Sequence, residues 1–590
     1  MTCSFPFVLM LARAGARLAS GDDPFPAASP ESQGIAAAAL EQLQSEVRGL
    51  VARDTIVGAE LLVIKNRRTV LHEAYGWRDR DAKIAMQRDT IFNIRSMSKP
   101  FTGAAVQMLI DDGDLEVTDT VAAHLDCFDR DATRAITVQQ LLSHRGGLPL
   151  TMLTTSIDQY PDLHAMACAA AAAPPQFPPG SRFWYSDAGT DVLGAVVEQI
   201  SGENLARFLR ERLFAPLGMA DTLHLNADGD ARWARVASLY IGRPGHWQRF
   251  WKPAGKPFYG FAWGSQSVYS TPRDYARFLA LWMDRGRRGD VQVLSDAAVT
   301  RTLTPVCEMS QLGSDARYPS GFPDLVAYYG QMAIVYVDAE QRPVVIGHSG
   351  SDGTWAWAWP AQDLMVLYFT QSRGQVTGVR LERLIDQLLV QRERKPEPPA
   401  PPEIAPLLGE YLADFAAYRD EPWQVRYERG RLVVDIPSQI AVTLSSADAN
   451  GQWTFDSPAK QAVRFERDDR GDVDAMLLRE GPLEYCLPRL GREQHPPSYP
   501  DDVARCLGRY HNADGTLTAE IAMRDGWLVM DWPGETAYEL LAPDAKGVWP
   551  LRASRNLTIQ FDGGDAKQAA WLVYRQPGRE MKMMRVDGAQ

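Results

Sequence analysis

A proline-dense segment at residues 395–406, KPEPPAPPEIAP, divides this chain into two parts of different character. Proline lacks a backbone N–H and its ring fixes φ, so six prolines in twelve residues exclude helix and sheet and indicate a stiff linker. Residues 30–394 mix β-branched runs with amphipathic helical patterns, whereas residues 407–590 show short alternating runs separated by Gly, Asp and Asn. The 590 residues exceed the ~250–300 that one core supports, so we expect several domains.

The tail carries three short motifs twice, in the same order. The pairs are LGEY at 408–411 with LGRY at 507–510, GRLVVDIP at 430–437 with GWLVMDWP at 526–533, and the strands around Phe465 and Phe561. Ordered matches with equal spacing predict a duplicated β unit, and roughly ninety residues of alternating strand can close a small barrel without exposed edges. We therefore expect two antiparallel β-barrel domains, at residues 407–491 and 503–590, joined by a linker at 492–502.

Charge and cysteine content exclude several function classes. A net charge of −12 argues against sequence-independent binding of DNA or RNA, which needs a basic surface. The six cysteines form no CxxC pair and no Cys/His cluster, so we expect no zinc or redox site, and no other metal or cofactor is indicated. Cys486 and Cys506 lie in neighbouring copies of the repeat and are candidates for a disulfide, but their sparse spacing favours unpaired thiols.

Residues 1–29 are predicted to be an N-terminal tail. Residues 5–12 form an apolar run of the kind found in signal peptides, but no basic residue precedes it, and Arg13 and Arg17 follow it. No stretch approaches the ~20 apolar residues of a membrane span, so we expect none. The compartment stays open between the cytoplasm and the periplasm or exterior, and an oligomer is neither indicated nor excluded.

The chemistry is concentrated in residues 91–115, which change from a strand pattern to a helix pattern in the middle. Ser96 and Lys99 lie three residues apart at the start of the expected helix, so their side chains share one face. Pro100 is expected in the first turn, because it has no N–H to donate, and Gly113 is a good stop. The apolar face of this helix consists of Phe101, Ala105, Met108 and Leu109.

This spacing suits nucleophilic catalysis. A serine hydroxyl is a weak nucleophile until a base takes its proton, and a lysine acts as that base only when burial or nearby positive charge lowers its pKa. The N–H of Ser96, at a helix start, is also free to support an oxyanion. The S-x-x-K pattern alone is a weak signal, since S-P-A-K at 457–460 repeats it by chance in a strand context.

Further motifs follow Ser96 in the same block. Tyr185-Ser186-Asp187 stands between a Pro-Gly turn and a helical pattern, and His348-Ser349-Gly350-Ser351 ends an apolar strand. Two other segments, LLSHRGGLP at 141–149 and SVYSTPRDYARFLALW at 267–282, lie between these motifs. Trp355, Trp357 and Trp359 alternate along the next strand and are expected on one sheet face that packs on a helix.

In type and order, these motifs resemble those of the serine β-lactamase and penicillin-binding-protein superfamily, closest to its class C β-lactamase, esterase and D-aminopeptidase branch. Ser96-Met97-Ser98-Lys99 matches S-x-x-K, Tyr185-Ser186-Asp187 matches Y-x-N, and His348-Ser349-Gly350 matches K-T-G in an H-x-G form. The resemblance covers roughly residues 30–394 and implies a penicillin-recognising α/β (α+β) domain with a central antiparallel sheet flanked by helices. D-aminopeptidases of the superfamily carry two lipocalin-like barrels after this domain, and a barrel loop that restricts access to the site, which we expect here.

The resemblance also implies roles for single residues. Ser96 would form an acyl-enzyme, and Lys99 and Tyr185 would share proton transfer, with either of them as the base. The backbone N–H groups of Ser96 and Ser351 would form the oxyanion hole. Substrate-binding roles would belong to Asp187, His348 and Gly350. His144 is expected to be structural.

Two positions depart from the family pattern. Position 187 is Asp where most members have Asn, and position 348 is His where β-lactamases have Lys. Both changes argue against an efficient β-lactamase, because an amide donor and a standing positive charge are lost. Asp187 either pairs with Lys99, which would shift proton transfer towards Tyr185, or attracts a substrate ammonium, or has no special role.

Three functional interpretations compete. We favour a serine acyl hydrolase that acts on an amide, peptide or ester bond of a small molecule or short peptide. A D-aminopeptidase-like activity is preferred, and the alternatives within the superfamily are a carboxylesterase, a weak β-lactamase or a DD-carboxypeptidase. An α/β-hydrolase is rejected, because position 351 is Ser where the G-x-S-x-G elbow needs Gly. A non-catalytic binding or regulatory protein of the same fold is the third, and the intact Ser96, Lys99 and Tyr185 argue against it.

Overall fold

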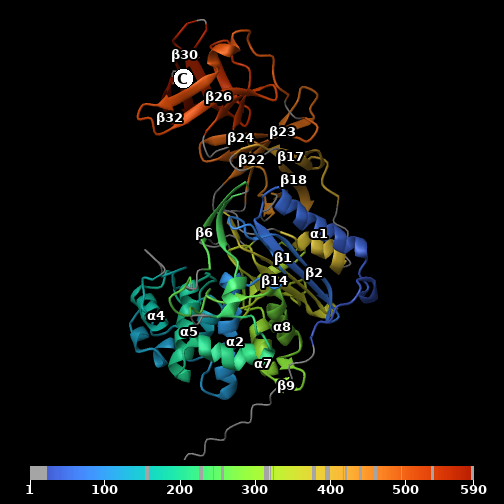
Figure 1. Ribbon diagram of the computed structural model, residues 1–590, viewed down its shortest axis with the longest axis vertical. Coiled ribbons are helices and arrows are strands. Elements are labelled where there is room, and N and C mark those ends of the chain that lie inside the picture. The colour runs from blue at the N-terminus through green and yellow to red at the C-terminus, as the bar shows by residue number, and fades with distance from the viewer. Residues whose placement is uncertain are drawn as a thin grey trace, which may run out of the picture.

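The chain folds into a mixed α/β unit followed by two β units, which lie in a row in Figure 1. The computed structural model describes residues 23–586 except 153–157, 225–229, 244, 254–257, 311–317, 319–320, 323, 375–379, 392–398, 416–417, 419–420, 429, 437–440, 456–460, 493–494, 533–536 and 566. The first β unit lies between the α/β unit and the second β unit, which ends the chain (Figure 1).

A nine-stranded, fully antiparallel sheet forms the centre of the α/β unit. Its order is β10 (Cys307–Glu308), β11 (Val326–Tyr329), β12 (Ile334–Val337), β13 (Pro343–Ser349), β14 (Trp355–Trp359), β15 (Leu364–Thr370), β1 (Gly58–Lys65), β2 (Arg68–Asp79) and β3 (Ile84–Ala85). Because β1 pairs with β15, the two ends of this part of the chain meet inside one sheet. Such a sheet buries both faces when helices cover both.

Helices cover both faces of this sheet (Figure 1). On one face lie α1 (Ala37–Ala52), α10 (Glu382–Ile385) and the π-helical turn η8 (Asp386–Val390), and on the other lie α2 (Lys99–Asp112), α5 (Asp187–Ser201) and α8 (Pro272–Met283). The remaining α-helices are α3 (Val138–Leu142), α4 (Leu163–Ala172), α6 (Leu205–Leu209), α7 (Ala215–Leu217) and α9 (Asp296–Leu303). Trp355, Trp357 and Trp359 are all buried within this sandwich.

Minor strands complete the α/β unit. They are β4 (Phe92–Asn93) with β7 (Tyr269–Ser270), β5 (Leu239–Arg243) with β6 (His246–Trp251) and β16 (Ser372–Gly374), and β8 (Arg287–Arg288) with β9 (Val291–Gln292). Strand β4 leads into the 3-10 turn η2 (Arg95–Ser98), and strand β7 leads into α8. Because β4 pairs with β7, η2 and α8 begin next to one another.

The central helix α2 is buried on every side along most of its length. Pro100 lies in its first turn and Gly113, at φ 83°, ends it, as the sequence predicts. The predicted apolar face is buried, but so is every other residue from Lys99 to Leu109. A helix that is buried all round lies inside a core, so α2 is a core helix. Its buried surface is wider than the single apolar face predicted from the sequence.

The tail forms two β units of eight strands each. In the first, β17 (Gly409–Ala413), β18 (Glu421–Glu428), β19 (Arg431–Asp435) and β20 (Val442–Thr443) form one sheet, and β21 (Gln452–Thr454), β22 (Ala462–Arg467), β23 (Val473–Glu480) and β24 (Leu483–Pro488) form another. Single bridges, Tyr411 to Arg489 and Leu444 to Phe455, join their edges. The predicted fold class is confirmed by the antiparallel α/β unit and by the closed barrel that follows.

The second β unit is a closed eight-stranded barrel. Its strands are β25 (Gly508–Asn512), β26 (Thr518–Arg524), β27 (Trp527–Asp531), β28 (Tyr538–Leu540), β29 (Val548–Leu551), β30 (Ser554–Asp562), β31 (Trp571–Gln576) and β32 (Arg579–Arg585). Pairing of β25 with β32 closes the ring and leaves no free edge among these strands.

The two β units contain the same side-chain hydrogen bonds at equivalent positions. Tyr411 and Tyr510, the tyrosines of the two LGxY motifs, each donate a 2.8 Å hydrogen bond to the carbonyl four residues before them. Arg489 and Arg585, near the ends of the two units, donate to backbone carbonyls of the same turn, at 2.6–3.0 Å. Identical contacts at matching positions support the duplication inferred from the sequence.

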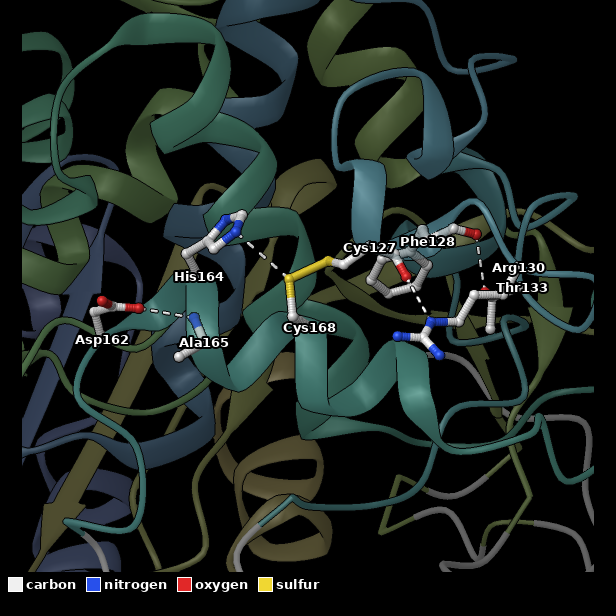
Figure 2. The surroundings of a disulfide bond; sticks show 8 residues. All are labelled: Cys127, Phe128, Arg130, Thr133, Asp162, His164, Ala165 and Cys168. Atoms are coloured by element: carbon white, nitrogen blue, oxygen red, sulfur yellow. Dashed lines mark hydrogen bonds between the residues drawn. A yellow bond between two sulfur atoms is a disulfide. The ribbon is translucent and has the colours of Figure 1, made fainter.

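A disulfide joins Cys127, in the turn η4 (Asp126–Phe128), to Cys168 in α4, with a Cα–Cα distance of 5.5 Å (Figure 2). This bond cannot be predicted from the sequence, because 41 residues separate the two cysteines and no local pattern marks them. Cys486 and Cys506 are buried free thiols, as favoured above.

Several sequence expectations fall outside the described residues. These include the signal-like run at 5–12, part of each linker and the chance S-P-A-K match at 457–460. Within the described chain, no helix has the length and apolar character needed to cross a membrane.

Candidate active site

Ser96 lies in η2, the tight turn between β4 and α2, and Lys99 is the first residue of α2. Because the two residues are about one turn apart, their side chains meet: Lys99 Nζ lies 3.1 Å from Ser96 Oγ. Lys99 is fully buried, whereas Ser96 lines an open pocket. The turn therefore places the Ser96 hydroxyl in the pocket and the buried Lys99 amine directly behind that hydroxyl.

Three acceptors surround the Lys99 amine. Besides Ser96 Oγ, Nζ lies 2.6 Å from Asp187 Oδ1 and 3.2 Å from the carbonyl oxygen of Ser265. Burial alone would lower the pKa of Lys99, but the Asp187 carboxylate and Tyr185 outweigh it and raise that pKa above its usual value. Lys99 is therefore an ammonium, which can donate to these acceptors but has no lone pair with which to accept a proton.

Tyr185 stands just before α5, where Ser186 caps the helix by accepting from the N–H of Gly189 at 2.9 Å. Lys99 Nζ lies 4.8 Å from the centre of the Tyr185 ring, and the side chains of Ser96 and Lys99 lie close enough to the phenol to favour its phenolate form. Burial raises the pKa of Tyr185, and the Lys99 charge opposes that rise.

Asp187 begins α5 and faces Lys99, so it forms the ion pair that the sequence left as one of three alternatives. One helical turn later, Asp191 is buried and accepts from the N–H of Ser265 at 2.9 Å. Burial and the nearby Asp187 raise the pKa of Asp191 to about 7. Neither of these two carboxyl groups belongs to the described lining of the pocket over Ser96.

His348 lies at the end of β13 and is buried, with both ring nitrogens engaged. Nδ1 lies 2.7 Å from the carbonyl oxygen of Ser349, which can only accept, so Nδ1 carries the proton and Nε2 accepts from the Tyr329 hydroxyl at 3.0 Å. Burial and the Lys99 charge lower the pKa of His348 to about 3. A neutral His348 does not supply the positive charge of the family lysine.

The hydrogen-bond chain continues beyond Tyr329 to His144. His144 Nε2 lies 3.1 Å from the Tyr329 hydroxyl, and its Nδ1 accepts from the N–H of Ser186 at 3.3 Å. Burial and the Lys99 charge hold the pKa of His144 well below its ordinary value. His144 thus holds Tyr329 and the segment next to Tyr185 in place, which agrees with the structural role expected for it.

The turn after β13 approaches the nucleophile turn closely. A Cβ on Gly350 would lie 2.4 Å from the carbonyl oxygen of Ile94, so only glycine fits there. The N–H of Gly350 donates to the carbonyl of Thr354 at 2.8 Å, which closes the turn that carries Ser351. Ser351, like Ser96, lines the pocket.

The pocket over Ser96 is mostly apolar and aromatic. Its lining residues are Ser96, Phe183, Tyr185, Met309, Ser310, Tyr318, Ile334, His348, Ser349, Gly350, Ser351, Gly353, Thr354, Trp355 and Arg380. Arg380 is paired with Glu382 at 3.0 Å. None of these described lining residues belongs to the tail, so the expected barrel loop over the site is not found among them.

The chain also matches a known protein family. The Beta-lactamase family model matches residues 43–390, more than half of the chain. The chain belongs to the Beta-lactamase family. The resemblance stated from the motifs is thereby confirmed, and members of this superfamily include serine hydrolases of esterase, penicillin-binding-protein-like and β-lactamase type.

Relatives of this Beta-lactamase family chain include "Protein Rv1367c" of Mycobacterium tuberculosis, 30% identical over 370 residues, covering 56% of this chain and 90% of that protein. "Protein flp" of Staphylococcus aureus is 27% identical over 187 residues, 31% of this chain and 38% of that protein. EstCE1, a hydrolase with promiscuous acyltransferase activity, has a TM-score of 0.50 at 21% identity and covers 60% of this chain and 98% of its own. The octameric penicillin-binding protein homologue from Pyrococcus abyssi has a TM-score of 0.50 at 18% identity. The match covers 84% of this chain and 99% of that chain.

Sequence reasoning missed several residues of this site. Tyr329 and Arg380 reach it from segments without a recognisable motif, and Asp191 was hidden in an ordinary helical pattern. For Asp191 a signal existed, since its spacing of four from Asp187 puts both carboxyl groups on one helix face. Within the described chain, no cluster of three or more His, Cys, Asp or Glu is arranged to hold a metal ion.

Proposed function

We propose that this protein is a serine acyl hydrolase that forms a covalent acyl-enzyme on Ser96. The observation that carries the proposal is the 3.1 Å contact between Lys99 Nζ and Ser96 Oγ at the floor of a pocket that Tyr185 also lines. A nucleophile, a buried cation and a phenol within hydrogen-bond reach form the set that acyl transfer needs.

Tyr185 takes the proton of Ser96 in this mechanism. Lys99 stays charged because Asp187 lies 2.6 Å away, and an ammonium has no lone pair with which to accept a proton. The Lys99 charge favours the phenolate of Tyr185 and so opposes the effect of burial on its pKa. Ser96 Oγ then attacks the substrate carbonyl as its proton moves to Tyr185 Oη.

The tetrahedral oxyanion is stabilised by backbone donors. The N–H groups of Ser96 and Ser351 face it from the two turns that meet at Gly350 and Ile94. Tyr185 next returns its proton to the leaving alcohol or amine, and the carbon–oxygen or carbon–nitrogen bond breaks. A water, deprotonated by Tyr185, cleaves the acyl-enzyme, and the proton returns to Ser96 with release of the acid.

The substrate class that fits best is a neutral ester or amide with an apolar acyl group. Phe183, Met309, Tyr318, Ile334 and Trp355 line the pocket, and its described lining contains no carboxylate. Asp187 is already paired with Lys99, so it is not free to attract the ammonium of an aminoacyl substrate. This favours the carboxylesterase alternative over the D-aminopeptidase-like one. Neutral His348 and paired Arg380 also argue against tight binding of a β-lactam carboxylate.

A non-catalytic member of the family is the competing hypothesis. A non-catalytic protein would need no ordered proton network. Here the Lys99 amine hydrogen-bonds with Ser96, Asp187 and the Ser265 carbonyl, and Ser96 lines a pocket. We also assign the activity to residues 30–394, because all the described pocket residues lie there.

A hydrolysis screen tests the proposal. p-Nitrophenyl butyrate, D-alanine p-nitroanilide and a chromogenic cephalosporin are offered to the wild type and to Ser96→Ala, with a fluorophosphonate label read by intact mass. We expect the ester to be the best substrate and the label to be found on Ser96. No label and no turnover of any of the three would overturn the proposal. A clear preference for the D-aminoacyl amide would keep the hydrolase and overturn the substrate class.

A further inference from the structure

The residues next to the two proposed oxyanion donors form a buried ion pair. Arg95 precedes Ser96 and Asp352 follows Ser351, and Arg95 Nε donates to Asp352 Oδ2 at 2.7 Å. Their side chains are 3% and 0% exposed. This salt bridge joins residues that are 257 positions apart in the sequence. It connects the turn that carries Ser96 to the turn that carries Ser351.

Arg95 adopts a backbone conformation that needs support. Its φ is 49°, in the left-handed region that non-glycine residues rarely enter. Its N–H donates to Asn93 Oδ1 at 3.1 Å, and its Nη1 donates to the Tyr259 hydroxyl at 2.7 Å. The guanidinium also lies 5.2 Å from the centre of the Phe258 ring. These contacts fix the turn that carries Ser96, whose N–H is one of the two proposed oxyanion donors.

Asp352 fixes the opposite turn. It is followed by Gly353, whose N–H donates to the carbonyl of Gly350 at 3.0 Å. Its second oxygen, Oδ1, lies 4.0 Å from Arg373 Nε on β16. The two turns therefore touch at two places, at the backbone between Gly350 and Ile94 and at the Arg95–Asp352 pair.

Two fixed points determine the spacing of the groups between them. We infer that Arg95 and Asp352 are positioning residues that hold the N–H groups of Ser96 and Ser351 at the separation an oxyanion requires. This inference rests on the proposed function, since it concerns the acyl-transfer step on Ser96. An oxyanion hole acts mainly in the transition state, so loss of the pair lowers kcat and leaves KM for a neutral ester nearly unchanged.

The test compares ground-state and tetrahedral ligands in the full-length protein. Asp352→Asn keeps the side-chain shape but removes the charge. With p-nitrophenyl butyrate we expect kcat to fall about 10²-fold, with KM within about 3-fold of the wild type. Phenylboronic acid forms an adduct in which Ser96 Oγ adds to boron and a boron-bound oxygen occupies the oxyanion position, so its affinity should fall with kcat.

A matched control separates positioning from stability. Asp79 forms a mostly buried pair with Arg249 at 2.7 Å, away from the pocket lining. Asp79→Asn should lower the melting temperature while kcat and the boronate affinity stay at wild-type values. If Asp352→Asn does not fold, the double variant Arg95→Met/Asp352→Leu decides, because it leaves no uncompensated buried charge.

The outcomes distinguish this inference from the proposed function. Wild-type kcat and boronate affinity in a folded Asp352→Asn, or in the folded double variant, overturn the inference alone. A rise in KM at constant kcat also overturns it, because that would mean a role in ground-state binding. If Ser96→Ala keeps wild-type turnover and no adduct forms on Ser96, the proposed function fails, and the inference fails with it.

Discussion

The hydroxyl of Tyr329 donates to Nε2 of His348, the histidine of the H-x-G motif, at 3.0 Å. Through His144 the same hydroxyl is linked to the N–H of Ser186, beside Tyr185. The directions of all these bonds are fixed, because the Ser186 N–H can only donate and the Ser349 carbonyl can only accept. The segment that carries Tyr185 and the strand that leads to Ser351 are therefore held by one buried polar chain.

The first prediction concerns the nucleophile. Ser96→Ala should lower kcat by at least ~10³-fold, because the covalent route is lost while binding remains. Steady-state kinetics with p-nitrophenyl butyrate measure this. Ser457→Ala, in the chance S-P-A-K match, is the control and should leave kcat unchanged. A stable acyl adduct detected by intact mass on Ser96→Ala would show that another residue is the nucleophile.

The second prediction concerns the coupling of Lys99 and Tyr185. Each of Lys99→Ala and Tyr185→Phe should raise the barrier by several kcal/mol, on the order of 10²–10⁴-fold in rate. The double variant should cost far less than the sum, because Tyr185 acts only beside the Lys99 charge. A double-mutant cycle on kcat/KM measures the coupling, and simple additivity would mean that the two residues act independently.

The third prediction concerns pH. In the proposed mechanism the phenolate of Tyr185 is the base, and burial raises the pKa of Tyr185, so kcat/KM should increase with pH through the neutral range. Asp187→Asn removes a negative charge that raises the pKa of both Tyr185 and Lys99, so the rising limb should move to lower pH. The pH profile of kcat/KM, measured with a neutral ester and with a D-aminoacyl amide, checks this.

The two substrates make the Asp187 experiment selective. Pairing with Lys99 predicts the same shift for both, whereas a KM increase confined to the free-amine substrate would mean that Asp187 binds a substrate ammonium. Glu203→Gln, just beyond the C-terminal end of α5, removes the same charge far from Lys99 and should leave the profile unchanged.

The fourth prediction concerns the tail. A protein ending at Arg394 should fold, because the core of the α/β unit is a separate hydrophobic cluster from those of the two β units. Since no described pocket residue comes from the tail, kcat and KM for p-nitrophenyl butyrate should stay within about 2-fold of the full-length values. Broadened substrate choice in the shorter protein would instead indicate a tail segment over the site.

The fifth prediction concerns the disulfide. The Cys127–Cys168 bond closes a loop with a sequence separation of 41 residues, so its reduction should cost about 3–4 kcal/mol of unfolding free energy. Urea unfolding with and without dithiothreitol measures the loss, and Cys127→Ser/Cys168→Ser should reproduce it without added reductant. Cys307→Ser, which removes a free thiol, serves as the control. Equal stability of both redox forms would contradict the prediction.

The sequence predicted the parts of the site that lie in local motifs. Ser96 and Lys99 meet because they are one turn apart, and Tyr185 and Asp187 follow from a strand-to-helix pattern. Such features depend on short-range geometry, which spacing in the sequence encodes directly. The two repeated β units could be predicted for the same reason, since a duplicated pattern is visible in the sequence alone.

The contacts that were missed join residues far apart in the chain. Arg95 meets Asp352 across 257 residues, and Cys127 and Cys168 are joined across 41 without any flanking motif. His348 was predicted to bind substrate, but the sequence contains no sign that the Tyr329 hydroxyl bonds its Nε2. Charge states in a buried site depend on the full set of neighbours, which periodicity and composition do not reveal.

The pairing of β1 with β15 has a consequence for how the protein is made. Ala59 pairs with Thr370, so a ribosome must synthesise about 300 further residues before the first long strand acquires one of its two partners. At ~5–20 residues per second, the β1–β2 hairpin waits on the order of 15 to 60 s with an unpaired apolar edge. During synthesis, this unpaired edge is a site at which the nascent chain can aggregate, and a chaperone that covers it would prevent this.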